Sequence, residues 1–193
     1  MLKITGGFFR GRKIQAPKGR HTRPTAEKVR QSLFNVLEHM DVLDGARVVD
    51  LFAGSGALGI EALSRGAAHV TFVESHGRTA ALVRENLISL EIPPDQWRVE
   101  TKKAEVWLGQ IAENPAPLIL LADPPYAGDL AATILVKASQ TKAVAAGTIV
   151  VVECDHRNPP PIPGNLELLQ VKSYGDTDVI YSRKFTSPQG LEG

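Results

Sequence analysis

One stretch constrains the fold of this chain more than any other: Val48-Val49-Asp50-Leu51-Phe52-Ala53-Gly54-Ser55-Gly56-Ala57-Leu58-Gly59. Its first half is an apolar run typical of a buried strand, and its second half is rich in glycine. Ile60-Glu61-Ala62-Leu63 then begins a helix. A strand, a Gly-rich turn and a helix in this order form a nucleotide cradle at the C-terminal end of a parallel strand, where glycine lets the backbone approach a ligand.

The spacing Gly54-x-Gly56-x-x-Gly59 matches the dinucleotide fingerprint, and Glu74 follows about twenty residues later, as that fingerprint expects. A redox dinucleotide places its pyrophosphate at the helix N-terminus. Asp50 is a poor neighbour for a pyrophosphate and a good one for a cationic ligand that carries an ammonium and a sulfonium group. This favours S-adenosylmethionine as the cofactor. Two alternatives stay open: Asp50 caps the turn, or the chain is a dinucleotide-dependent oxidoreductase.

Apolar runs and helical patterns alternate along the rest of the chain. We expect strands at 46–52, 69–74, 97–102, 117–122 and 147–153, and helices at 56–65, 76–91, 104–113 and 129–144. This alternation predicts an α/β fold with a parallel sheet covered by helices on both faces. Leu166–Tyr174 and Val179–Phe185 are predicted to form a hairpin that adds antiparallel strands at one edge.

The first forty residues have a different pattern. Residues 2–15 predict a short β-hairpin with strands at Leu2-Lys3-Ile4 and Phe8-Phe9-Arg10, and a helix follows, with Thr25 as its N-cap and its end near His39. We therefore expect an N-terminal extension at 1–40, the main domain at 41–186 and a frayed tail at 187–193.

The basic side chains are concentrated at the N-terminus. Residues 1–30 hold nine lysines or arginines and one acid, whereas the whole chain has a net charge of +1. This asymmetry favours nucleic acid as a partner over a solvated tail, because Phe8, Phe9 and four glycines are interleaved with the charges. Either phenylalanine could stack on an unpaired base or belong to the core of the hairpin.

Composition narrows the class of protein. No apolar run approaches the roughly 18 residues of a membrane span, and the N-terminus is too polar for a signal peptide. The single cysteine, Cys154, excludes an internal disulfide and fits a reducing cytosol. It follows an apolar run, which favours packing over a nucleophilic role. No Cys/His spacing indicates a metal site. We expect a cytoplasmic protein, monomeric and without a metal.

A second informative stretch is Leu118-Ile119-Leu120-Leu121-Ala122-Asp123-Pro124-Pro125-Tyr126. An apolar strand here delivers Asp-Pro-Pro-Tyr at its C-terminal end, where open parallel sheets bind ligands. The two prolines remove two backbone donors, so the site is rich in acceptors: the Asp123 carboxylate and the carbonyl of Pro124. Tyr126 adds a flat ring on which a base can stack. The alternative to a binding site is that Asp-Pro-Pro-Tyr is an ordinary turn that ends a strand.

Two acceptors and a stacking ring suit the exocyclic amino group of a nucleobase. Its lone pair is delocalised into the ring, and accepting both of its N–H bonds makes the nitrogen a better nucleophile towards a methyl carbon. Catalysis is then mostly orientation and hydrogen-bond electrostatics, on a base that has left its stack. A non-catalytic RNA-binding assembly factor that keeps the cofactor pocket is another alternative.

These motifs together resemble a known family. Asp50 to Gly56 resembles motif I of class I S-adenosylmethionine-dependent methyltransferases, and Asp123-Pro124-Pro125-Tyr126 resembles their amino-methylating motif IV. The whole chain resembles the bacterial 16S ribosomal RNA guanine(966)-N(2)-methyltransferases. The matching stretches are Ile4-Thr5-Gly6-Gly7, Arg10-Gly11-Arg12, Arg23-Pro24-Thr25, Val29-Arg30-Gln31-Ser32-Leu33-Phe34-Asn35, Gly54 through Gly66, the Asp-Pro-Pro-Tyr and Tyr174-Gly175-Asp176-Thr177.

The resemblance implies a Rossmann-like class I methyltransferase with a mostly parallel seven-stranded sheet and an antiparallel edge strand. It implies methylation of guanine N2 in 16S rRNA, within a 30S subunit or an assembly intermediate, although adenine N6 in DNA or RNA remains an alternative target. Lys103 stands where the family often has an acid or amide, which leaves the adenine contact to the backbone around Ala104. Asn86 either faces the site or lies on the helix surface.

The resemblance also assigns candidate site residues. The catalytic set is Asp123, Pro124 and Tyr126. The cofactor-binding set is Asp50, Phe52, Gly54, Ser55, Gly56, Glu74 and Ala104, in which Glu74 accepts both ribose hydroxyls. The RNA-binding set is Arg10, Arg12, Lys13, Arg20, Arg23 and Arg30.

Overall fold

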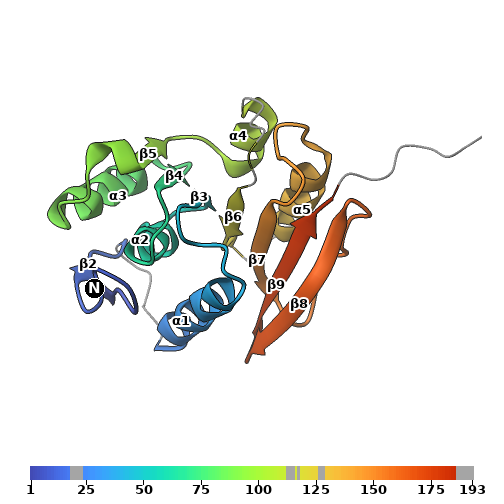
Figure 1. Cartoon of the computed structure of the whole chain (residues 1–193), viewed down its shortest axis with the longest axis horizontal. Coiled ribbons are helices and arrows are strands. Elements are labelled where there is room, and N and C mark those ends of the chain that lie inside the picture. The colour runs from blue at the N-terminus through green and yellow to red at the C-terminus, as the bar shows by residue number, and fades with distance from the viewer. Residues whose placement is uncertain (18–23, 112–115, 117, 126–128, 186–193) are drawn as a thin grey trace, which may run out of the picture. The chain divides into compact units, whose positions relative to one another are not determined.

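A computed structural model describes residues 1–17, 24–111, 116, 118–125 and 129–185 (Figure 1). The chain divides into two compact units, Met1–Ala104 and Glu105–Gly193. The N-terminal extension predicted at 1–40 lies within the first of these units. The predicted tail at 187–193 lies outside the described residues.

The first unit combines the N-terminal hairpin with three parallel strands and their helices. Its elements are β1 (Leu2–Lys3), β2 (Lys13–Ile14), α1 (Pro24–His39), β3 (Arg47–Leu51), α2 (Ala57–Ser64), β4 (His69–Val73), α3 (Gly77–Ser89), the short 3₁₀ helix η1 (Pro94–Gln96) and β5 (Trp97–Glu100). The parallel strands lie in the order β5-β4-β3, and α4 (Ala104–Gln110) begins at the unit's last residue. The hairpin lies beside α2 (Figure 1).

Helix α2 packs closely onto β3 and β4 because its third residue is Gly59. A Cβ on Gly59 would collide with the ring of Phe72 and lie 2.8 Å from Cγ1 of Val70, both on β4. Gly59 therefore sets the distance between the helix and the sheet. Close packing of helix on strand is the role expected of the third glycine in the fingerprint.

Replacing Gly59 with alanine is expected to lower the free energy of unfolding by about 1–3 kcal/mol, because the Cβ overpacks the core against Phe72. Gly109→Ala is the matched control, since Gly109 lies in α4 and a Cβ added there would meet nothing within 4 Å. That change should alter stability by less than about 1 kcal/mol, and in the stabilising direction. Urea denaturation of both variants checks the difference, and equal effects would contradict the packing argument.

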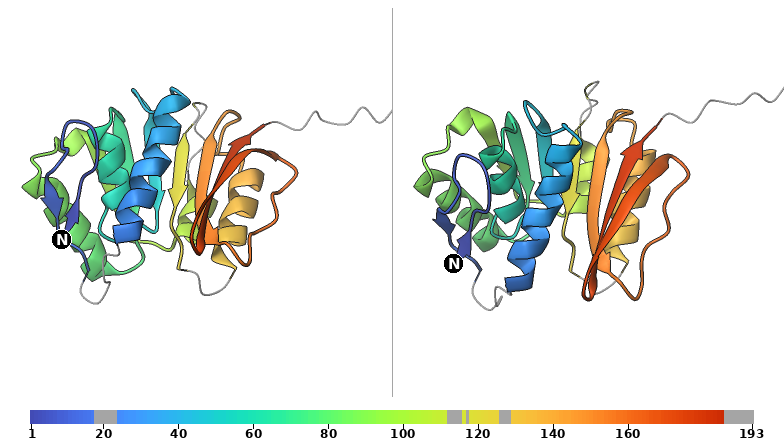
Figure 2. Two further views of the ribbon diagram at one scale, coloured as in Figure 1. Left: turned by 90° about the horizontal axis from the view of Figure 1, so that it is seen from below. Right: turned by 60° about the horizontal axis from the view of Figure 1, so that its bottom comes forward.

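The second unit contains two parallel strands and a long hairpin. Its elements are β6 (Ile119–Ala122), α5 (Leu130–Gln140), β7 (Ile149–Asp155), β8 (Leu166–Tyr174) and β9 (Thr177–Lys184). The order is β6-β7-β9-β8, with β9 antiparallel to both neighbours. Helix α5 packs on β7. Strand β9 runs beside β7, and β8 runs beside β9 (Figure 2). The two-residue turn between β8 and β9 begins at Gly175, whose φ is +62°.

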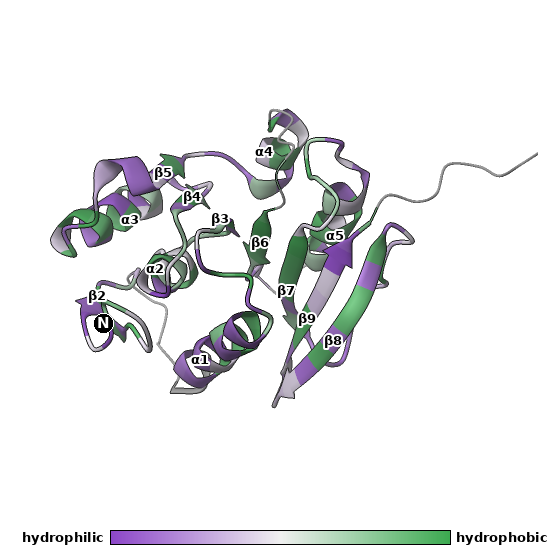
Figure 3. Ribbon diagram, in the orientation of Figure 1, coloured by the Kyte–Doolittle hydropathy of each residue, from purple (hydrophilic) through white to green (hydrophobic). Residues whose placement is uncertain are grey.

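Hydropathy explains which strands are covered. All four residues of β6 are buried, and so are the first four of β7, and both strands are hydrophobic along most of their length (Figure 3). Strand β8 mixes polar and apolar residues and is mostly exposed or half-buried, as expected at the edge of a sheet. Among the described residues, no helix is long and apolar enough to cross a membrane.

The predicted fold class is confirmed: the main sheet has seven strands and is mostly parallel, with β9 antiparallel. Two local predictions at the N-terminus are wrong. The second strand of the hairpin is Lys13–Ile14 rather than Phe8–Arg10, and the helix begins at Pro24, so Thr25 lies inside its first turn. Proline is well suited to a first helical position because the N–H that it lacks has no partner within the helix.

Candidate functional site

The Gly-rich turn after β3 has an unusual backbone. Phe52, Gly54 and Gly56 have φ values of +78°, +56° and +80°. A phenylalanine in the left-handed region is strained, and such residues cluster at ligand sites. Two hydrogen bonds hold the strained segment, because the N–H groups of Phe52 and Ala53 both donate to the carbonyl of Val73 at 3.0 Å. The turn is therefore fixed against the end of β4.

Glu74 meets this turn from the next strand. It follows β4 directly and is 8% exposed. Its Oε2 accepts a hydrogen bond from the N–H of Gly54 at 3.0 Å, and its Oε1 accepts one from the N–H of His76 at 2.8 Å. The structure thus brings together the glycine turn and the acid that follows it by twenty residues in the sequence. The carboxylate stands where a hydroxyl donor on a ligand would find an acceptor.

Asp50 has a role that the sequence alone leaves open. It lies within β3, is 1% exposed, and its Oδ2 accepts a hydrogen bond from the N–H of Gly59 at 2.9 Å. Gly59 is the third residue of α2, so the carboxylate of Asp50 caps this helix from β3. In most helices the capping side chain belongs to the residue immediately before the helix. The hydrogen bond from Gly59 gives Asp50 a structural role at the start of α2. A negative charge at this helix N-terminus is also electrostatically favourable.

The remaining predicted residues of the cofactor and catalytic sets are placed as follows. Ser55 is buried within the turn at 8% exposure, and Ala104 is buried at the start of α4. In the second unit, Asp123 directly follows β6 and is half-buried, while Pro124 is buried. Tyr126 lies outside the described residues.

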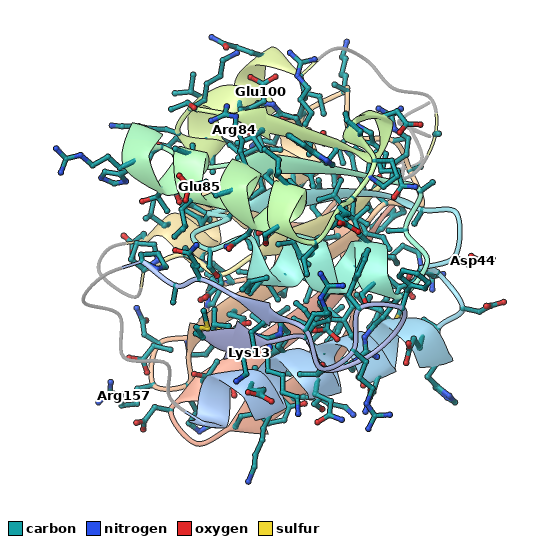
Figure 4. All side chains as sticks on the ribbon, turned by 90° about the vertical axis from the view of Figure 1, so that its left-hand side faces the viewer. Lys13, Asp44, Arg84, Glu85, Glu100 and Arg157 are labelled. Carbon is teal, nitrogen blue, oxygen red and sulfur yellow. The ribbon has the colours of Figure 1, made fainter. Side chains whose placement is uncertain are left out.

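The hairpin presents an exposed basic surface. Its exposed cations are Lys3, Arg10, Arg12 and Lys13. Phe8 is 89% exposed, whereas Phe9 is half-buried and meets it edge-on, with 5.1 Å between the ring centroids. Phe8 is therefore the ring whose face is accessible for stacking. Figure 4 shows Lys13 on β2, on the same side of the first unit as α3. Arg20 and Arg23 lie outside the described residues.

Helix α2 anchors this hairpin. The N–H of Phe8 donates to the carbonyl of Ser64 at 2.7 Å, and the N–H of Phe9 donates to its Oγ at 2.9 Å. Thr5 donates to Glu61 through its N–H at 2.9 Å and through its Oγ1 at 2.6 Å. Gly7 has a φ of +70°, and a Cβ there would collide with the Ser64 carbonyl. The Thr-Gly-Gly turn therefore fits only against the C-terminal end of α2.

Arg30 does not belong to the exposed basic surface. It is 5% exposed, its Nε lies 3.4 Å from Oε2 of Glu61, and its Nη2 donates to the carbonyl of Lys3. A guanidinium enclosed in this way is not accessible to a phosphate, so the predicted RNA contact of Arg30 is wrong. Its charge instead balances that of the fully buried Glu61. The only feature of the sequence that indicates this role is the presence of an acid within an apolar helix.

Asn86 is a functional candidate that sequence pattern alone could not place. It is 1% exposed on α3, neither on the surface nor facing open space. Its Oδ1 accepts from the N–H of Gln15 at 2.9 Å, and its Nδ2 donates to the carbonyls of Gln15 at 3.0 Å and Ser55 at 2.9 Å. The signal that identifies it is a lone amide on an apolar helix face, between Val83 and Leu87.

Cys154 behaves as a packing residue, as predicted. It is 3% exposed on β7. Burial, with a further contribution from the charge of Asp178, raises the pKa of its thiol to about 11, so the thiol stays protonated at neutral pH. Among the residues that the structure describes, no group of three or more His, Cys, Asp or Glu side chains is placed to hold a metal ion.

Comparison with known proteins identifies the family. A family model described as Conserved hypothetical protein 95 matches residues 2–183. The Escherichia coli protein named Ribosomal RNA small subunit methyltransferase D is 34% identical over 185 residues, covering 95% of this chain and 90% of that protein. Its Haemophilus influenzae namesake is 32% identical over 174 residues, covering 90% and 89%. The chain is thus related to these proteins over almost its whole length.

Solved structures agree. The structure of yhhF from Escherichia coli matches with a TM-score of 0.83 at 32% identity, covering 96% of this chain and 99% of that one. A distant structure, SMU.776 complexed with SAH, shares the fold with a TM-score of 0.62 at 13% identity, covering 84% of this chain and 50% of that one. The chain belongs to the Conserved hypothetical protein 95 family, together with the ribosomal RNA small subunit methyltransferases D.

Proposed function

We propose that this protein transfers a methyl group from S-adenosylmethionine to the exocyclic N2 of a guanine in 16S ribosomal RNA, within a small-subunit particle. Membership of a family with named small-subunit rRNA methyltransferases supports the reaction class. The observation that carries the proposal is the strained Gly-rich turn with the Glu74 carboxylate against it, because this arrangement suits a nucleoside cofactor.

The residues of the turn fit this cofactor. Gly54 and Gly56 adopt left-handed conformations at no steric cost. A Cβ on Gly56 would lie 3.2–3.4 Å from the core side chains of Val83, Ile60 and Phe72, so glycine is needed for this tight turn. Glu74 offers carboxylate oxygens to the two ribose hydroxyls, and buried Asp50 contributes negative charge that favours a cationic ligand. When bound, S-adenosylmethionine supplies a methyl group on a sulfonium, which is a good leaving group.

Asp123 and Pro124 are the proposed acceptors for the base. The carboxylate of Asp123 and the carbonyl of Pro124 accept the two N–H bonds of the guanine amine and so orient its lone pair. Two consecutive prolines remove two backbone N–H donors from this segment, which makes it rich in acceptors. Tyr126 is proposed to stack on the base after it leaves its helix. Catalysis then rests on position and hydrogen-bond electrostatics.

The hairpin is the proposed RNA-binding surface. Arg10, Arg12 and Lys13 would contact phosphates, with Arg20 and Arg23 extending the set. Exposed Phe8 would stack on an unpaired base. Because α2 anchors the hairpin, the backbone that carries Phe8, Arg10, Arg12 and Lys13 is held in place and is not a free tail.

Reversing two charges of the hairpin, Arg10→Glu with Arg12→Glu, is expected to weaken binding to small-subunit particles and to flatten its salt dependence. Each lost phosphate contact removes about 0.7–0.9 from the slope of log K against log salt, so the loss of two contacts should shrink the slope by about 1.4–1.8. Lys142→Glu with Lys172→Glu changes the net charge equally at exposed sites of the second unit. Filter binding between low and moderate salt checks this; equal slopes for both double variants would remove the hairpin from the interface.

The deciding experiment is transfer of a labelled methyl group from S-adenosylmethionine to unmodified 30S particles, followed by nucleoside analysis. Label in N2-methylguanosine is the expected result. Label in N6-methyladenosine would overturn the target base and keep the amine chemistry. Absence of label with intact cofactor binding would favour a non-catalytic assembly factor, and binding of NADH without S-adenosylmethionine would favour an oxidoreductase.

A further inference from the structure

We propose that Asn86 is a positioning residue that joins the RNA-binding hairpin to the cofactor turn, so that one side chain links the two binding surfaces. The inference rests on the proposed function, because it takes the turn as the cofactor site and the hairpin as the RNA surface. It adds a residue that touches neither ligand.

The carboxamide of Asn86 is fully engaged. It is 1% exposed and has one acceptor and two N–H donors. Three hydrogen bonds of 2.9–3.0 Å use the acceptor and the Nδ2 donors. A buried amide with this many partners holds all of them in one arrangement, since losing any of them leaves a buried polar group unpaired.

The partners of Asn86 come from both binding surfaces. The N–H and the carbonyl of Gln15 pair with Asn86 as they would with a neighbouring strand, directly after β2 of the hairpin. The second donor of Nδ2 goes to the carbonyl of Ser55, between the left-handed Gly54 and Gly56. The side chain therefore links the backbone that leaves the hairpin with the backbone of the cofactor turn.

The anchor of the hairpin on α2 lies away from the cofactor turn. Thr5 and Phe9 bind Glu61 and Ser64, in the C-terminal half of α2, whereas the turn precedes the N-terminus of that helix. Asn86 instead reaches the turn directly. A change on the hairpin side of this amide is consequently expected to alter the cofactor turn.

The test changes the link from the hairpin side. Gln15→Pro removes one backbone donor to Asn86, and Ile14 before it is already in a strand, which a following proline accepts. Gln15→Ala is the matched control, because it keeps both backbone bonds and alters only an exposed side chain. Asn86→Asp changes the link itself by removing both Nδ2 donors. Glu85→Ala is its control on the exposed face of α3 (Figure 4).

The readouts are the dissociation constant for S-adenosylhomocysteine, by calorimetry without RNA, the affinity for unmodified 30S particles, and the melting temperature. Gln15→Pro and Asn86→Asp are each expected to weaken S-adenosylhomocysteine binding by about 3- to 10-fold, the loss of roughly one hydrogen bond. Both should also weaken particle binding. The two control variants should match the wild type.

Two results would overturn the inference. If both variants melt earlier but bind S-adenosylhomocysteine within about twofold of the wild type, Asn86 only stabilises the fold. If Asn86→Asp weakens cofactor binding and Gln15→Pro does not, Asn86 supports the turn without joining it to the hairpin. A wild type that binds no S-adenosylhomocysteine would instead refute the proposed function, and the inference with it.

Discussion

Replacing Glu61 with alanine is expected to lower the free energy of unfolding by about 3–5 kcal/mol, the cost of leaving buried charges without their partner. Glu61 is 0% exposed, and its carboxylate accepts hydrogen bonds from Thr5, Arg30 and Arg65. Without it, the guanidinium of Arg30, which is 5% exposed in the wild type, loses its ion pair. The loss should exceed that of any single surface substitution.

The effect should also be local to the hairpin. Thr5 holds the first turn of the hairpin through this carboxylate, at 2.9 Å from its N–H and 2.6 Å from its Oγ1. We therefore expect faster hydrogen exchange at residues 4–12 in Glu61→Ala than in the wild type. Arg30 and Arg65 both lose a hydrogen bond to Glu61, but Arg65 loses less stabilisation because it keeps a 2.9 Å ion pair with Glu38 on α1.

Urea denaturation checks the size of the loss. Glu61→Gln retains the shape and one acceptor oxygen but removes the charge, so its loss should lie between the wild type and Glu61→Ala. Glu85→Ala, on the exposed face of α3, should change stability by less than about 0.5 kcal/mol. A loss below about 1 kcal/mol for Glu61→Ala would show that the hairpin and α2 are not held by this cluster.

The parallel strands and the helices between them were predictable because they depend on local pattern. A buried parallel strand is an apolar run, and β6 and β7 are such runs. The hairpin of β8 and β9 was predictable from two strand patterns on either side of Gly175, although β9 begins at Thr177, two residues before the predicted Val179. The meeting of Glu74 with the Gly-rich turn followed from the parallel pairing of β3 and β4, which brings their ends together.

The hairpin was not predictable in the same way. Its apolar Phe8 and Phe9 resemble a strand, yet the backbone there leaves the ladder to donate to Ser64, more than fifty residues later in the chain. Arg30 was misplaced and Asn86 was left open for the same reason, because each is a polar residue buried by tertiary partners. The partner of Arg30 is Glu61, and the partners of Asn86 are Gln15 and Ser55. Sequence patterns carry no information about such distant partners.

Replacing Asp123 with alanine is expected to lower methyl transfer by at least about 10²-fold while leaving the affinity for S-adenosylhomocysteine within about twofold. The reason is that its proposed partner is the amine of the base, so its hydrogen bond acts on orientation and on charge that develops during the reaction. Losing one such preorganised group costs about 10²–10³ in turnover in other enzymes. Single-turnover transfer to unmodified 30S particles, with calorimetry for the cofactor, measures both quantities.

The comparison with two further variants makes this assignment specific. Asp123→Asn keeps one acceptor oxygen and adds a donor, so turnover should fall less than in Asp123→Ala if accepting the N–H bond is what matters. Asp129→Ala removes an exposed carboxylate six residues further along and should leave turnover unchanged. A loss of cofactor affinity as large as the loss of turnover would instead assign Asp123 to the cofactor. Equal turnover in the wild type and Asp123→Ala would move the chemistry away from the Asp-Pro-Pro-Tyr segment.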